Sequence, residues 1–207
     1  MSNGEIIEIV LASGNEHKAD EIENWLQGRG HPVRVVSARE FGGMDGCEET
    51  GTTFEENAQL KVEFLLKRIP PNFWVLADDS GLAVDALQGE PGVFSARFAG
   101  EGASDRQNRE LLLERIRKVS SPRRRSARFV CVLALSKNHK PSDILLFRGE
   151  CEGRILCCPH GDGGFGYDSV FAATGSQQSF AEISQEEKSL VSHRGRALEK
   201  LEKELTG

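Results

Sequence analysis

Two pairs of adjacent carboxylates are the residues of this sequence best suited to chemistry. Glu48 and Glu49 form one pair, and Asp78 and Asp79 form the other. Adjacent carboxylates repel each other unless a positive group joins them, and Mg²⁺ is a hard cation that takes oxygen ligands while it keeps waters and contacts phosphates. The pairs therefore indicate a magnesium site, although the tetrapeptide Asp78–Gly81 taken by itself is more typical of a plain β-turn.

A short glycine-containing loop lies where a strand is expected to turn into a helix. Ser13-Gly14-Asn15 follows the apolar run Ile6–Leu11, and Lys18 falls in the first turn of the expected helix. Backbone N–H groups at a helix start favour an anion, and Lys18 can reach back toward them. A capped loop with a solvated lysine fits these residues equally well, and the GxxxxGK[ST] phosphate loop is absent.

A second glycine-rich segment and a cluster of donors lie near the end of the chain. Gly163-Gly164-Phe165-Gly166-Tyr167-Asp168 permits close backbone approach beside a ring that can stack on a base. A hairpin with one core aromatic is the alternative. His193 and Arg194 are expected in the first turn of a helix, where cations oppose the macrodipole, so an anionic or carbonyl-rich ligand would explain them. Lys188 adds a third donor to this cluster.

Hydrophobic periodicity predicts a mixed α/β chain that positions these residues. Strands are expected at Ile6–Leu11, Trp74–Ala77, Leu82–Ala86, Ser126–Leu135 and Ile144–Glu152. Helices are expected through residues 22–26, at Phe54–Arg68, through 111–116 and after Ser192. Leu205 is expected on the apolar face of the last helix. Ser104 with Gln107, and Ser184 with Glu187, form capping boxes that begin helices. The basic run Arg123–Arg125 is interpreted as a solvated loop.

The bulk composition limits the partners. The chain has 207 residues, of which 38% are hydrophobic and 28% charged, which suits one well-cored domain or two small lobes that share a sheet. A net charge of -6 provides no broad positive field, so we expect no nucleic-acid partner. The sequence shows neither a signal peptide nor an apolar stretch of roughly 20 residues, so we expect a cytoplasmic protein without a membrane partner.

The cysteines favour the same compartment. There are five, an odd number, and the adjacent Cys157 and Cys158 cannot readily form a loop-closing bridge with each other. A zinc site with His160 would lack both a usual ligand spacing and a fourth ligand. Reduced thiols are the favoured interpretation.

Taken together, six stretches resemble the inosine triphosphate pyrophosphatase family, also called the non-standard purine NTP pyrophosphatases. They are Leu11–Lys18, Glu48–Lys61, Leu76–Leu87, Pro91–Gly100, Gly163–Phe171 and Ala181–Leu198. The resemblance covers nearly the whole chain, and several ordered motifs are far more specific than any one. Departures are slight: Ser13 stands where threonine is frequent, His17 is bulky for its position, and Cys157-Cys158 fall in a variable segment.

The resemblance implies an elongated α/β fold in which a mixed sheet flanked by helices forms two lobes around a nucleotide-binding cleft. The whole chain, residues 1–207, would be a single pyrophosphatase domain that usually forms a homodimer. It would use Mg²⁺ to hydrolyse ITP, dITP and XTP to the monophosphate and pyrophosphate, which removes these nucleotides from the pool that supplies DNA and RNA. A septum-related nucleotide pyrophosphatase and a non-catalytic nucleotide-binding module are the rival hypotheses.

The resemblance also implies roles for individual residues. The triphosphate would be held by Ser13, Gly14, Asn15, Glu16, His17 and Lys18. Mg²⁺ would be bound by Glu48 or Glu49 with Asp79, and the phosphates would be assisted by Ser80. The base and sugar would be held by Phe165, Gly166, Tyr167 and Asp168, and the base would be contacted by Lys188, His193 and Arg194. Asp79 would also accept the proton of the attacking water. Attack between the α and β phosphates, rather than at the γ phosphate, is implied by the resemblance alone.

Overall fold

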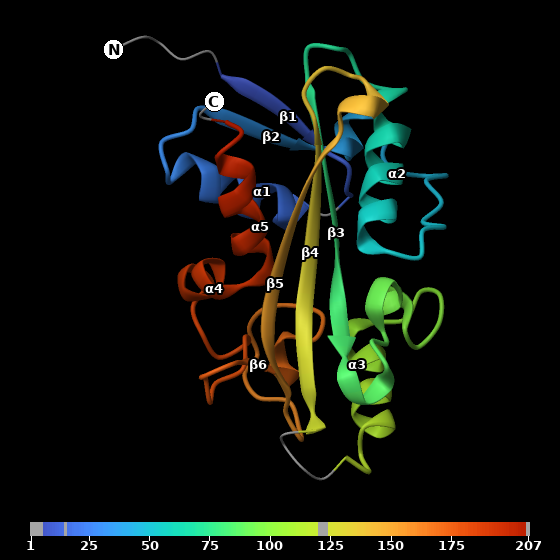
Figure 1. Cartoon of the computed structure of the whole chain (residues 1–207), viewed down its shortest axis with the longest axis vertical. Coiled ribbons are helices and arrows are strands. Elements are labelled where there is room, and N and C mark those ends of the chain that lie inside the picture. The colour runs from blue at the N-terminus through green and yellow to red at the C-terminus, as the bar shows by residue number, and fades with distance from the viewer. Residues whose placement is uncertain (1–5, 15, 120–123, 206–207) are drawn as a thin grey trace. The chain divides into compact units, whose positions relative to one another are not determined.

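The computed structural model describes residues 6–14, 16–119 and 124–205, which contain a six-stranded sheet in the order β2-β1-β3-β4-β5-β6 (Figure 1). The strands are β1 Ile7–Leu11, β2 Val33–Ser37, β3 Trp74–Val84, β4 Ser126–Ser136, β5 Leu145–Ile155 and β6 Phe171–Ala173. β1 runs parallel to both β2 and β3, whereas β5 and β6 are antiparallel. The predicted mixed sheet of an α/β fold is therefore confirmed.

Five α-helices and several short 3-10 helices accompany the sheet in the described residues. The α-helices are α1 Glu16–Gln27, α2 Phe54–Leu66, α3 Asp105–Arg115, α4 Gln185–Val191 and α5 His193–Glu202, and the 3-10 helices include η1 Ala38–Phe41, η2 Asp85–Leu87, η3 Gly92–Arg97, η5 Pro141–Asp143 and η6 Asp168–Val170. α3 and α4 each begin at the predicted capping box, and α5 begins directly after Ser192 as expected. Helix α5 ends at Glu202, so Leu205 lies beyond it.

The chain divides into two compact units. Unit 1 comprises Met1–Asp79, Val132–Arg148 and Ala197–Gly207, and unit 2 comprises Ser80–Cys131 and Gly149–Arg196. Strands β3, β4 and β5 each contribute residues to both units. Each unit has its own core and its own group of candidate functional residues.

The core of unit 1 forms around β1. Ile9, Val10 and Leu11 are fully buried, as expected of a strand that is covered on both faces, and α1 packs beside β2. Helix α2 begins with a capping box between Thr53 and Glu56 and buries its apolar side chains. Because both helices are fixed by their apolar faces, their polar side chains are presented at defined positions.

The core of unit 2 is rich in aromatic rings. Phe129 packs edge-on against Phe171, with ring centroids 4.7 Å apart, and stacks on Phe180 at 5.9 Å. Tyr167 is buried in the same cluster, and its hydroxyl donates to the Ser95 carbonyl oxygen at 2.8 Å. This cluster anchors the segment that follows the glycines at 161–166.

The predicted turn at Asp78–Gly81 is wrong, because β3 runs unbroken from Trp74 to Val84. Asp, Ser and Gly favour turns only when their polar groups have no better partner. Here the strand lies between β1 and β4 in the sheet order, and the Asp78 and Asp79 side chains meet lysines. Tertiary contacts override the local preference.

The basic run before β4 is also not a plain solvated loop. Arg124 is exposed, but Arg125 is buried and donates to the carbonyl oxygens of Val119 at 2.8 Å and Leu156 at 3.0 Å. Arg123 lies outside the described residues. The guanidinium has five N–H donors, which suits it to bind several backbone carbonyls at once.

No α-helix among residues 6–14, 16–119 and 124–205 is both long and apolar enough to cross a membrane.

Candidate active site

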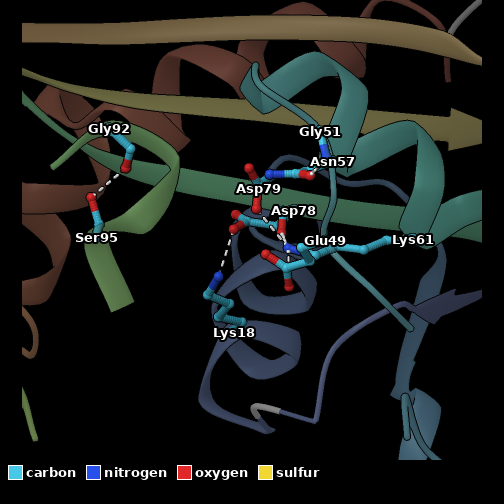
Figure 2. Close-up of polar contacts among 9 residues, drawn as sticks. All are labelled: Lys18, Glu49, Gly51, Asn57, Lys61, Asp78, Asp79, Gly92 and Ser95. Carbon is cyan, nitrogen blue, oxygen red and sulfur yellow. Dashed lines mark hydrogen bonds and ion pairs between the residues drawn. The ribbon is translucent and has the colours of Figure 1, made fainter. Parts of the chain in front are cut away.

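Buried carboxylates on β3 form the centre of the candidate site in unit 1. Asp78 and Asp79 are 2% and 6% exposed. Successive side chains of a strand point to opposite faces, so one cation cannot serve both carboxylates equally. Lys18 of α1 donates to Asp78 Oδ1 at 2.6 Å, and Lys61 of α2 donates to Asp79 Oδ1 at 2.6 Å (Figure 2).

Lys61 also joins the second acidic pair to the first. Its ammonium lies 3.1 Å from Glu49 Oε1 and 3.4 Å from the Asp78 carbonyl oxygen. Glu48 is exposed, whereas Glu49 is half-buried beside Lys61. The structure therefore brings Glu49, rather than Glu48, to Asp79.

Burial controls the proton affinity of this cluster. Burial raises the pKa of Asp79, and together with the nearby charges of Glu49 and Asp78 it outweighs the lowering by Lys61. Burial by itself would lower the pKa of Lys61, but the charges of Asp79 and Glu49 raise it overall. A raised pKa makes a carboxylate a better proton acceptor.

Two buried polar atoms of this cluster lack hydrogen-bond partners in the part of the chain that the structure describes. They are Asp79 Oδ2 and Asn57 Nδ2. Such atoms usually bond to a ligand, an ion or a water. Because Asp79 Oδ2 and the Glu49 carboxylate are hard oxygen donors, they fit Mg²⁺, which binds through one or two carboxylates and takes its other ligands from water and phosphate.

The described part of the chain forms no self-contained protein cage for a metal. Among the described residues, no group of three or more His, Cys, Asp and Glu side chains is arranged to hold an ion. This arrangement excludes a closed zinc-type site there but not a cation held by two carboxylates together with a substrate.

A close backbone approach fixes the loop that carries Glu49. Gly51 N donates to Asn57 Oδ1 at 2.8 Å, and a Cβ on Gly51 would come within 2.6 Å of that same oxygen. Only glycine fits against α2 at this distance. The contact therefore holds the loop, and with it Glu49, against the helix that carries Lys61.

The expected phosphate loop lies between β1 and α1. Ser13 and Gly14 are half-buried, and the Ser13 carbonyl oxygen accepts a hydrogen bond from Ser37 Oγ at 2.8 Å. Glu16 opens α1, and its exposed carboxylate pairs with Arg39 at 3.0 Å. Asn15 and the side chain of His17 lie outside the described part of the chain.

Ser80 follows Asp79 on β3 and is half-buried. It belongs to unit 2, whereas the two carboxylates belong to unit 1.

A second group of expected residues comes together in unit 2. Lys188 of α4 and Asp168 are both buried, and Lys188 Nζ donates to Asp168 Oδ2 at 2.6 Å. The same ammonium lies 4.8 Å from the centroid of the Phe165 ring, which is 46% exposed. An exposed ring beside a cation forms a surface on which a planar base can stack.

The remaining expected residues of unit 2 are buried. His193 is 6% exposed and stacks on Phe129, with ring centroids 4.7 Å apart, and Arg194 is 2% exposed. Tyr167 is 4% exposed, so its ring packs in the core and Phe165 alone of the two loop aromatics faces solvent. The alternative of one core aromatic thus describes Tyr167 correctly.

Sequence reasoning gave no role to Lys61 or Asn57. Both lie on α2 four residues apart, a spacing that places them on one face of a helix. A buried amide and a lysine aligned on a mainly apolar helix are the signal that could have identified them.

The chain matches the model of the Ham1 family over residues 9–204. It is 44% identical over 200 residues to the dITP/XTP pyrophosphatase of Leuconostoc mesenteroides subsp. mesenteroides, with 96% of each chain covered. It is 46% identical over 200 residues to the dITP/XTP pyrophosphatase of Exiguobacterium sp., with 96% of this chain and 97% of the relative covered. A solved HAM1 protein from Coxiella burnetii has a TM-score of 0.86 and 41% identity, with 97% of this chain and 98% of that chain covered.

The Asp168–Lys188 pair generates a prediction about stability. Asp168→Asn leaves the Lys188 ammonium buried without its counter-charge, so we expect the free energy of unfolding to fall by about 3 to 5 kcal/mol. The double variant Asp168→Asn/Lys188→Met should recover part of this loss, because it removes both charges.

Denaturant unfolding measures both effects. Glu110→Gln is the matched control, because Glu110 pairs with Arg106 on the exposed side of α3 and its loss should cost no more than about 1 kcal/mol. Equal costs for the buried and the exposed pair would contradict the prediction.

Proposed function

The chain belongs to the Ham1 family, and from this premise we propose that it hydrolyses the non-standard purine nucleotides ITP, dITP and XTP to the monophosphate and pyrophosphate. The names of its relatives support this substrate class. The proposed chemistry rests on one observation. Asp79 is a buried carboxylate that accepts a hydrogen bond from Lys61 through one oxygen, while its other oxygen has no hydrogen-bond partner among the described residues. A non-catalytic module would not need a buried acid held in this way.

The triphosphate is assigned to the unit 1 cluster. Lys18, the loop at residues 13 and 14 and the first N–H groups of α1 supply positive charge and donors for phosphate oxygens. The Glu16 carboxylate pairs with Arg39 and would repel phosphate, so its contribution is its backbone N–H. Lys61 adds a second ammonium beside Asp79, and Ser80 assists from the next position on β3.

Glu49 and Asp79 are the residues proposed to hold Mg²⁺. The bound ion would neutralise phosphate charge and polarise the anhydride. Asp79 is assigned the second task of accepting a proton from the attacking water. The water oxygen forms a bond to phosphorus, its proton passes to Asp79, and the α–β anhydride bond breaks so that pyrophosphate leaves as one unit.

The base is assigned to unit 2. Phe165 offers an exposed ring, while Lys188 and Arg194 are hydrogen-bond donors only. Hypoxanthine and xanthine present an acceptor at position 6, whereas adenine presents an amino donor. Adenine would therefore leave donors facing donors, at a cost of about 1 to 3 kcal/mol per unpaired group. His193 stacks on Phe129, and its proposed role is to contact the base from the start of α5.

We expect Asp79→Asn to lower turnover of ITP at least about 100-fold while the fold remains intact, because an amide is nearly isosteric but cannot accept the proton. Pyrophosphate release measures the effect. Asp85→Asn is the matched control: Asp85 is exposed just after β3, pairs with Arg128 at 2.8 Å, and should leave turnover unchanged. Turnover by Asp79→Asn within about tenfold of the parent, which is roughly 1.4 kcal/mol in barrier, would rule out the assigned role.

Base selectivity provides a separate test. The ratio kcat/KM should be far higher for ITP than for ATP and GTP, because sites built on hydrogen bonds can reject a wrong partner by about 10⁴-fold. GTP shares the 6-oxo group, so its exclusion must come from the pocket around Phe165. Arg194→Ala should lower ITP turnover much more than ATP turnover, whereas Arg196→Ala, an exposed arginine of the same helix, should not. Equal efficiency with ATP and ITP in the parent would refute the proposed base site.

The family resemblance further supports a homodimer in which each chain is one catalytic domain. The net charge of -6 argues against a nucleic-acid partner. The five cysteines are all free, which suits a reducing, cytoplasmic compartment. Light scattering on the purified protein should therefore give about twice the chain mass of 22.8 kDa. A monomer at all accessible concentrations would contradict the homodimer.

A further inference from the structure

The backbone around Phe165 is held by hydrogen bonds while its ring is left exposed. Phe165 N donates to Asp168 Oδ2 at 2.8 Å, and the Phe165 carbonyl oxygen accepts from Asp168 N at 3.1 Å. Both bonds come from within the loop and lock it into a tight turn. The ring itself is 46% exposed, so burial does not fix its position.

The next residue is held from outside the loop by α3. Gly166 N donates to Asp105 Oδ2 at 2.6 Å, and Arg109 Nη1 donates to the Gly166 carbonyl oxygen at 2.7 Å. Asp105 and Arg109 are four residues apart, so they lie on one face of α3. Two charged side chains therefore bind the peptide groups on either side of one glycine.

The contacts of Asp105 and Arg109 hold the loop at Gly166, the residue whose backbone is least restricted. Gly166 has a φ of 58°, a conformation that glycine adopts freely, so its flexibility must be removed by contacts. Hydrogen bonds to charged groups are stronger than those between neutral groups. With Asp168 on one side and α3 on the other, four successive polar groups from Phe165 N to Gly166 O have partners.

We propose that Asp105 and Arg109 are positioning residues that hold the Phe165 ring ready to stack on the purine base. This inference rests on the proposed function, because it assigns the base to Phe165. A ring fixed beside the Lys188 ammonium loses little freedom when a base binds, which strengthens binding without any new contact. The two side chains act through Gly166 and not on the substrate.

The expected signature is a rise in KM without a matching fall in kcat. The residues assigned to the metal and to water activation, Glu49 and Asp79, lie in unit 1, whereas α3 lies in unit 2. Arg109→Met should raise KM for ITP about tenfold, and Asp105→Asn should do the same, while kcat stays within about twofold. Arg109→Lys keeps a donor for the Gly166 carbonyl and should recover most of the loss.

Arg106→Met is the matched control. Arg106 lies on the same helix between the two positioning residues, but its exposed side chain pairs with Glu110. This variant loses an arginine and one ion pair yet leaves Gly166 untouched, so its KM should equal that of the parent. Thermal melting of every variant separates a loosened loop from an unfolded protein.

Hydrogen exchange at the Gly166 amide gives a readout that is independent of turnover. Exchange should be faster in Asp105→Asn than in the parent and unchanged in Arg106→Met. Three outcomes would each overturn the positioning role, given an active parent. They are an unchanged KM in the Asp105 and Arg109 variants, a fall in kcat as large as the rise in KM, and unchanged exchange at the Gly166 amide. Failure of the parent itself to release pyrophosphate from ITP would instead refute the proposed function.

Discussion

Two adjacent carboxylates buried on one strand are the constraint from which the arrangement of unit 1 follows. Because neighbouring side chains of a strand face opposite ways, Asp78 and Asp79 need separate cations. Lys18 from α1 serves one, and Lys61 from α2 serves the other. Each pair joins a helix to β3, so both helices must begin and run where their lysines can reach that strand.

The charge balance of this cluster bears on what it can bind. Three carboxylates, Glu49, Asp78 and Asp79, lie in ion pairs with the ammonium groups of Lys18 and Lys61. The ammonium groups favour phosphate oxygens, whereas the carboxylates favour a divalent cation. The proposed Mg²⁺ therefore has an electrostatic reason to accompany the substrate.

Unit 2 uses charge for a different purpose. Asp168 accepts from both Lys188 and the Phe165 amide, so a single buried carboxylate links a cation to the loop that carries the exposed ring. The Tyr167 hydroxyl then ties the loop to η3, and Arg109 ties it to α3. Rigid elements thus hold a short loop whose one exposed aromatic is assigned to the base.

The sequence by itself determined the α/β class, the helix starts at Ser104, Ser184 and Ser192, and the family, because these depend on local spacing and on ordered motifs. It did not determine that Asp78–Gly81 lies inside a strand, that Arg125 is buried, or that Glu49 rather than Glu48 meets Asp79. Those outcomes were decided by the tertiary structure, because each depends on partners distant in the sequence. Lys61 is 18 residues from Asp79, and Lys18 is 60 residues from Asp78. Local propensity describes the conformation that a segment prefers in water. A buried carboxylate in the middle of a sheet is stable only where the fold brings an oppositely charged side chain to it.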